Sequence, residues 1–105
     1  MIMPTQYNKL VRDYIPDIIT ASGKKCTVQT LSDDEYLEKL DAKLKEELNE
    51  YLESGSLEEL ADLLEVLYAV TEARGYTREE LERVRAAKAA DHGAFRKSIL
   101  LKTVC

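Results

Sequence analysis

Hydrophobic residues between positions 32 and 53 recur every three or four residues, the spacing that places them on one face of an α-helix. They are Leu37, Leu40, Leu44, Leu48 and Tyr51. Ser32, followed three residues later by Glu35, forms a capping-box sequence that typically opens a helix. The Ser-Gly-Ser sequence at 54–56 ends the pattern. The spacing therefore predicts one long amphipathic helix over residues 32–53.

The next segment, residues 56–74, is hydrophobic around most of its circumference. Ser56 with Glu59 forms a second capping-box sequence, and Gly75 offers a C-terminal cap. Only Glu58, Glu65 and Glu72 form a clearly polar strip. Such a helix is typically enclosed on most sides, and a short chain has little surface with which to cover it. We therefore expect a homo-oligomer, a dimer or a tetramer, with a monomeric bundle as the alternative.

Two shorter helices flank these two. Pro16 is well placed in a first helical turn and predicts a helix over residues 16–22. Thr77 with Glu80 is a third capping-box sequence, and it opens a helix that stops near residue 93.

The order of these segments predicts the fold class. We expect an all-α protein, an antiparallel helical bundle built around a central helical hairpin, in a single domain over residues 1–105. Residues 27–31 and 98–104 are β-prone and are candidates for a small two-stranded β ribbon.

Composition excludes several classes of protein. The 105 residues include 15 basic and 20 acidic side chains, a net charge of -5, which disfavours nucleic acid as a partner. No apolar run is long enough to span a bilayer, and the start MIMPTQYNKLVRD lacks the hydrophobic core of a signal peptide. We therefore expect a small soluble, cytoplasmic protein whose two cysteines are reduced, with no membrane partner.

The charge is concentrated in the middle of the chain. Residues 33–65 contain thirteen acidic and three basic side chains, a net charge of -10, whereas the remainder has a net charge of +5. A carboxylate block between positive segments suits a site for metal ions and an anionic substrate. A solvated helix face is the alternative interpretation.

Helix geometry indicates which carboxylates point inward. At about 100° per residue, Glu47 lies roughly 60° and Glu50 roughly 120° from the centre of the apolar stripe, whereas Glu46 lies nearly opposite it. On the following helix, Glu59 and Asp62 lie within or beside the apolar face. Each helix is thus expected to present two acids at or near its inner face.

The same four acids are expected to lie at matching levels of the hairpin. If the chain turns at 54–55, Glu50 faces Glu59 and Glu47 faces Asp62. Four converging carboxylates in a partly dry site cannot all stay ionised without a cation, and all-oxygen ligation suits Mg²⁺ or Mn²⁺. Two alternatives need no metal: Glu59 as a helix-capping residue, and Glu47 and Glu50 as edge residues that cover apolar surface. A di-iron site is disfavoured because His92 lacks the required Glu-x-x-His pattern.

These residues also carry a family resemblance. Glu46-Glu47-x-x-Glu50 followed by Glu59-x-x-Asp62 resembles the EExxE...ExxD signature of the all-α nucleoside triphosphate pyrophosphohydrolases, the MazG-like superfamily. The run YNKLVRDYIPDII at 7–19, with Lys88 and the sequence Gly-Ala-Phe at 93–95, resembles the phosphoribosyl-ATP pyrophosphohydrolase-like branch. The resemblance spans nearly the whole chain. It implies a single MazG-like domain that hydrolyses a nucleoside triphosphate, often a non-canonical one, to the monophosphate and pyrophosphate with Mg²⁺.

The resemblance also assigns roles to individual residues. It implies Glu47, Glu50, Glu59 and Asp62 as metal ligands, with Glu47 and Glu50 as the catalytic carboxylates and Glu46 ranked below them.

Candidates for phosphate binding are Lys9, Arg12 and Lys88. Alternatively, the first two form surface ion pairs with Asp13 or Asp17, and Lys88 is a solvated helix residue. The aromatic residues Tyr7, Tyr14 and Phe95 are candidates for a base-stacking wall or for the core.

Two features depart from the family pattern. The connection between the acidic pairs is short, and Asp91-His92 stands where relatives often carry more basic residues. The competing function is a non-catalytic helical module that binds a partner through its apolar second helix.

Overall fold

The computed structural model describes residues 5–105, which contain four α-helices. These are α1 (Ile15–Ala21), α2 (Asp33–Ser54), α3 (Leu57–Ala73) and α4 (Arg78–His92). The predicted all-α class is confirmed, and every helix begins and ends within about two residues of its expected bounds. In this part of the chain, no helix is both long and apolar enough to cross a membrane.

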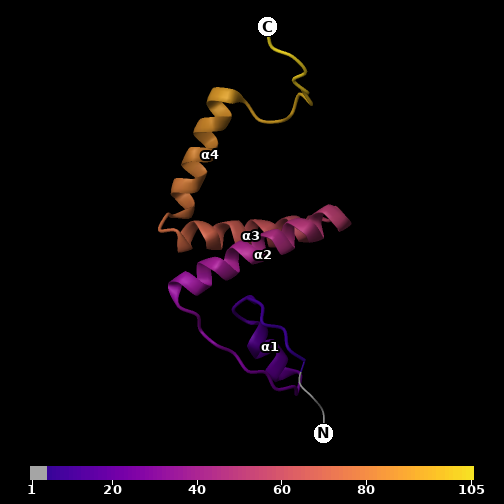
Figure 1. Ribbon diagram of the computed structural model, residues 1–105, viewed down its shortest axis with the longest axis vertical. Helices are drawn as coiled ribbons and strands as arrows, with labels where there is room; N and C mark the ends of the chain where they lie inside the picture. The colour runs from indigo at the N-terminus through magenta and orange to yellow at the C-terminus, as the bar shows by residue number, and fades with distance from the viewer. Residues whose placement is uncertain (1–4) are drawn as a thin grey trace.

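Helices α2 and α3 form the central hairpin and pack side by side (Figure 1). The turn depends on Gly55, whose left-handed backbone (φ 64°) suits glycine and whose N–H donates to the Tyr51 carbonyl at 2.7 Å. Ser56 then caps α3, because its hydroxyl accepts the backbone N–H of Glu59. The predicted hairpin and its turn are therefore present.

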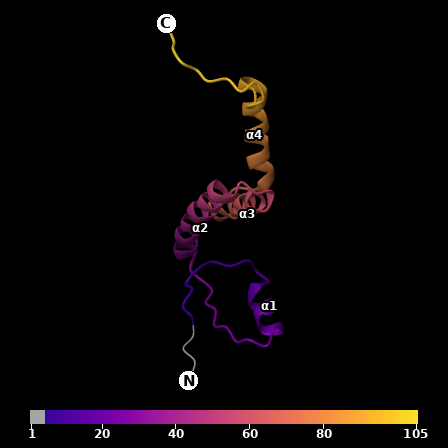
Figure 2. The same cartoon turned by 90° about the vertical axis from the view of Figure 1, so that its right-hand side faces the viewer.

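The four helices do not close into a bundle within one chain. Helix α1 lies on one side of the hairpin and α4 projects from the other, in both views (Figures 1 and 2). Helix α4 packs against α3 alone. The radius of gyration is 18.6 Å, whereas a compact chain of this length has one of about 13 Å. The molecule is therefore elongated, with a longest extent of 69 Å.

The second helix is uncovered within a single chain, as expected from a chain too short to enclose it. No residue of α3 is buried, and Leu57 and Leu64 are 81% and 46% exposed. Leu40 of α2 is the one buried hydrophobic residue in the part of the chain that the structure describes. The apolar surface of α3 exceeds what α2 and the start of α4 can cover, because a single hairpin buries only one stripe of each helix.

The predicted β ribbon is not formed: within residues 5–105 no strand is present. Residues 27–31 lie in the connection between α1 and α2, whereas residues 98–104 extend from α4 at the opposite end of the molecule (Figure 1). The two segments cannot pair because the whole hairpin separates them. Local β propensity carries no information on that separation.

Candidate metal centre

Carboxylates of α2 and α3 gather in two groups that share one residue. Glu46, Glu47 and Glu50 form the first group, and Glu47, Glu59 and Asp62 form the second. Within each group, one oxygen from every residue lies within 4.8 Å of the others. We call these five residues the acidic cluster. It contains all four carboxylates that the sequence singled out as metal ligands.

Glu47 is the buried centre of this cluster. It is only 6% exposed, and its Oε2 atom has no hydrogen-bond partner within the described chain. The other oxygen, Oε1, lies 3.4 Å from the Lys43 ammonium nitrogen. Burial raises the pKa of the Glu47 carboxyl above its ordinary value, and the neighbouring Glu50 raises this pKa further. A cation near Oε2 would relieve both effects.

Glu59 contributes a second unpartnered oxygen. Its Oε2 atom is also buried, with no hydrogen-bond partner among residues 5–105. The capping role predicted as an alternative uses only the Glu59 backbone N–H, which donates to Ser56 Oγ at 3.2 Å. The Ser56 N–H donates to Ser54 Oγ rather than to the Glu59 carboxylate. Capping therefore does not account for the position of the Glu59 carboxylate.

Helix α4, unlike α3, begins with a complete capping box. At Thr77, the hydroxyl accepts the N–H of Glu80 at 3.0 Å, and the Thr77 N–H donates back to the Glu80 carboxylate at 3.3 Å. Both hydrogen bonds of the capping box thus form at α4. At α3 only the backbone N–H of Glu59 bonds to the capping serine, and the Glu59 carboxylate lies in the acidic cluster.

The expected outward position of Glu46 is wrong. Its side chain is 27% exposed and belongs to the first carboxylate group. The N-terminal segment passes over this face of α2, and Lys9 Nζ donates to Glu46 Oε1 at 3.0 Å. This bond lowers the pKa of Glu46 and raises that of Lys9. A helical wheel omits such cover because it treats α2 in isolation.

The register across the hairpin matches the prediction in part. Glu47 lies near Asp62, as expected, but it also lies near Glu59. Glu50 groups with its own helix rather than with Glu59. Glu47 is therefore the residue that belongs to both carboxylate groups, and it connects the group on α2 with the carboxylates of α3.

Two of the three basic residues predicted to bind phosphate lie at the cluster. Besides the Lys9 pair with Glu46, Arg12 NH2 donates to Asp62 Oδ1 at 2.6 Å. The alternative ion pairs with Asp13 or Asp17 are absent from the described residues.

The sequence interpretation missed a third cation beside the cluster. Lys43 Nζ lies 3.6 Å from Glu46 and 3.4 Å from Glu47. The signal was available, because residues three and four apart on a helix are neighbours.

The remaining candidates are not brought to the cluster. Lys88 lies on α4, which contacts α3 but not α2. Phe95 is 99% exposed, and Tyr7 and Tyr14 are also exposed, so these rings form neither a core nor a stacking wall within one chain.

No family model matches this chain, and no solved structure matches it. An uncharacterized protein of Mycolicibacterium smegmatis (strain ATCC 700084 / mc(2)155) is 60% identical over 42 residues, which are 40% of this chain and 43% of that protein. The chain therefore matches less than half of the length of this relative.

Proposed function

We propose that this protein is a metal-dependent nucleoside triphosphate pyrophosphohydrolase. It hydrolyses an NTP or dNTP, including non-canonical ones, to the monophosphate and pyrophosphate. Mg²⁺, or Mn²⁺ in its place, is held by Glu47, Glu50, Glu59 and Asp62. The resemblance of Glu46-Glu47-x-x-Glu50 and Glu59-x-x-Asp62 to the signature of the MazG-like superfamily supports the same reaction.

The observation that carries the proposal is the position of Glu47. A buried carboxylate with an unpartnered oxygen is costly unless a cation compensates it. Lys43 approaches only Oε1, and a second unpartnered oxygen belongs to Glu59. Carboxylate oxygens are the ligands that Mg²⁺ and Mn²⁺ prefer, so the residues present fit such an ion.

In this proposal, basic residues of the chain bind the phosphates and an acidic residue accepts the proton. Lys9 and Arg12, whose cationic groups lie at the edge of the cluster, bind and orient the phosphates. Bound Mg²⁺ supplies charge neutralisation and lowers the pKa of a water. Glu50 accepts a proton from the attacking water. The water oxygen forms a bond to phosphorus, the phosphoric anhydride bond breaks, and pyrophosphate is the second product.

The proposal includes a homo-oligomer. The chain exposes 9890 Å², whereas a compact monomer of 11.9 kDa exposes about 6,000 Å². The excess of about 3,900 Å² per chain is larger than the roughly 1,000–2,500 Å² that each partner contributes to a permanent interface. A second copy that covers the apolar face of α3 would bury part of it.

A second candidate function rests on that same apolar face. The protein would then be a non-catalytic helical module that binds a partner through α3, and the carboxylates would serve solubility. The exposure of Leu57 and Leu64 favours this candidate as much as it favours oligomerisation. The non-catalytic module does not explain why the Oε2 atoms of Glu47 and Glu59 are buried without a hydrogen-bond partner in the described chain.

Pyrophosphate release tests the proposal. Wild-type protein, E50Q and the matched control E53Q are compared on a panel of canonical and damaged nucleoside triphosphates, with Mg²⁺ and with a chelator. We expect metal-dependent release in wild type and E53Q, and loss of at least a hundredfold in E50Q. Absence of release from every triphosphate contradicts the proposal and favours the non-catalytic module.

A further inference from the structure

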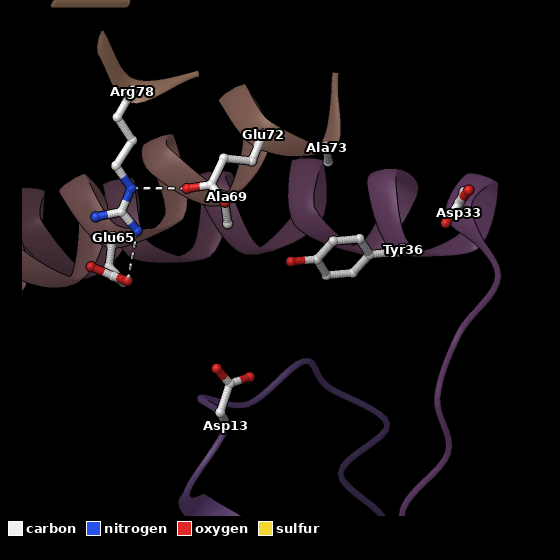
Figure 3. A pocket seen from close by; sticks show the side chains of 8 residues that line it. All are labelled: Asp13, Asp33, Tyr36, Glu65, Ala69, Glu72, Ala73 and Arg78. Carbon is white, nitrogen blue, oxygen red and sulfur yellow. Dashed lines mark hydrogen bonds and ion pairs between the residues drawn. The ribbon is translucent and has the colours of Figure 1, made fainter. Parts of the chain in front are cut away.

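A pocket of about 520 Å³ lies beside the acidic cluster and outside it. Its walls come from the N-terminal segment, the start of α2, the last turns of α3 and the first residue of α4 (Figure 3). The volume is within the range of small-molecule sites. The pocket thus joins the N-terminal segment, α2 and the junction of α3 with α4, three parts of the chain that are separate in sequence.

One wall is held in place by Arg78. Its Nε donates to Glu72 Oε1 at 2.8 Å, and its NH2 lies 3.8 Å from Glu65 Oε1 (Figure 3). The guanidinium also lies over the Tyr68 ring, 4.4 Å from the centroid. Arg78 therefore compensates two of the acids that line the pocket. Ala69, between them on α3, leaves room because its side chain is short.

The opposite side presents two groups that remain available to a ligand. Tyr36 of α2 offers an aromatic ring that is 37% exposed. Asp13 faces the pocket from the N-terminal segment (Figure 3). Among residues 5–105, no basic side chain pairs with Asp13. A ring for stacking and a carboxylate that accepts hydrogen bonds together suit a flat heterocycle with N–H donors.

The pocket begins where the acidic cluster ends. Glu65, in its wall, follows Asp62 by three residues of α3, a rise of about 4.5 Å. Asp13 follows Arg12, whose guanidinium bonds Asp62. A nucleotide whose phosphates lie at the cluster can therefore extend its sugar and base toward Tyr36.

We propose that this pocket binds the nucleobase of the substrate, and that Asp13 selects guanine. Guanine offers two adjacent donors, N1–H and the 2-amino group, that match the two oxygens of a carboxylate. Adenine, cytosine and uracil each place an acceptor where one of these donors lies, and a carboxylate repels it. The inference rests on the proposed function, since it supplies the base specificity of the same site.

Uncharged nucleosides test the pocket independently of metal and of hydrolysis. Guanosine, adenosine, cytidine and uridine are titrated into metal-free protein while the methyl resonances of Ala69 and Ala73 are followed by NMR. We expect guanosine to shift both methyls and to bind at least tenfold tighter than the other three. Equal binding of all four nucleosides, or no shift with guanosine, overturns the inference.

Two substitutions separate selection from stacking. D13N replaces the carboxylate with an amide that matches adenine, so we expect guanosine binding to fall at least tenfold and adenosine binding to rise. Y36L removes the ring, and we expect every nucleoside to bind about tenfold more weakly. D17N, the matched control on α1, leaves all affinities unchanged. An unaltered preference in D13N contradicts the role of Asp13.

These outcomes are distinct from those that test the reaction. Guanosine binding without pyrophosphate release supports the base pocket and contradicts the proposed hydrolysis. Pyrophosphate release without any nucleoside-induced shift of the Ala69 and Ala73 methyl resonances supports the hydrolysis and contradicts the base pocket.

Discussion

Lys9 Nζ lies 3.0 Å from Glu46 Oε1, although 37 residues separate the two side chains in the sequence. Together with the 2.6 Å bond from Arg12 to Asp62, this pair holds the N-terminal segment against both helices of the hairpin. Asp62, a proposed metal ligand, and Glu46, which lies beside the proposed ligands, are thus already paired with the basic side chains proposed to bind phosphate. The proposed metal site and the proposed phosphate site therefore share one edge of the acidic cluster.

Substitution of Glu47 is expected to separate metal binding from folding. E47Q keeps the shape of the side chain and removes a buried charge, so the metal-free protein should be as stable as wild type or more stable. Mg²⁺ should raise the free energy of unfolding of wild type by about 2.7 kcal/mol at a hundred times its dissociation constant, and that of E47Q far less. Thermal denaturation with Mg²⁺ and with a chelator measures both effects.

The matched control is E53Q, at an exposed position of α2. Its response to Mg²⁺ should equal that of wild type. A response to Mg²⁺ that is the same in E47Q as in wild type would show that Glu47 does not hold the ion.

The raised pKa of Glu47 predicts how stability depends on pH without metal. The folded protein retains a proton on this carboxyl at pH values where the unfolded chain, with a pKa near the reference value of 4.5, has released it. Its contribution to stability is therefore most favourable below that reference value and is lost as the pH rises through the raised folded pKa. Glu46, whose pKa is lowered, acts in the opposite direction.

The difference between wild type and E47Q isolates the Glu47 contribution. Urea unfolding of both proteins in a chelator, at pH values from 4 to 8, should show wild type losing stability relative to E47Q as the pH rises. A constant difference across this range would contradict the raised pKa.

Removal of the Arg12 charge is expected to affect substrate binding more than folding. The Arg12 and Asp62 side chains are about half exposed, so their ion pair stabilises the fold by no more than about 1 kcal/mol. A charge-assisted bond to phosphate is stronger, and R12Q should raise KM for the triphosphate about tenfold. Steady-state kinetics and urea unfolding measure the two quantities, with R83Q on α4 as the control. A large loss of stability with unchanged KM would assign Arg12 a structural role instead.

The helices and their starts could be predicted because their determinants are local. Ser32, Ser56 and Thr77 all accept a backbone N–H three residues later, as their capping-box sequences indicated. The level of Glu47 and Asp62 across the hairpin followed from the turn near Gly55. In each case the relevant residues lie within one helix or one turn.

The parts that were missed depend on distant segments. Glu46 was expected to face solvent because nothing near it in sequence indicates that Lys9 covers it. Tyr36 was not singled out, since its pocket exists only where Asp13 and α3 meet α2. The exposure of α3, by contrast, was expected from its apolar circumference, because enclosure needs a covering surface that the single chain does not provide.

That uncovered face leads to a prediction about assembly. Leu60, Leu64 and Leu67 recur at helical spacing along α3, and each is at least 40% exposed. A charge introduced among them would lose the burial of an apolar side chain and would itself need desolvation in an interface.

We therefore expect wild-type protein to sediment as a dimer or larger species at micromolar concentration, and L64E to raise the dissociation constant at least a hundredfold, about 2.7 kcal/mol. N49E, which adds the same charge at an exposed polar position of α2, should leave assembly unchanged. Sedimentation velocity over a range of concentrations measures both. A wild-type protein that stays monomeric, with Leu64 still open to solvent, would remove oligomerisation as the explanation of this surface and would favour a different partner for α3.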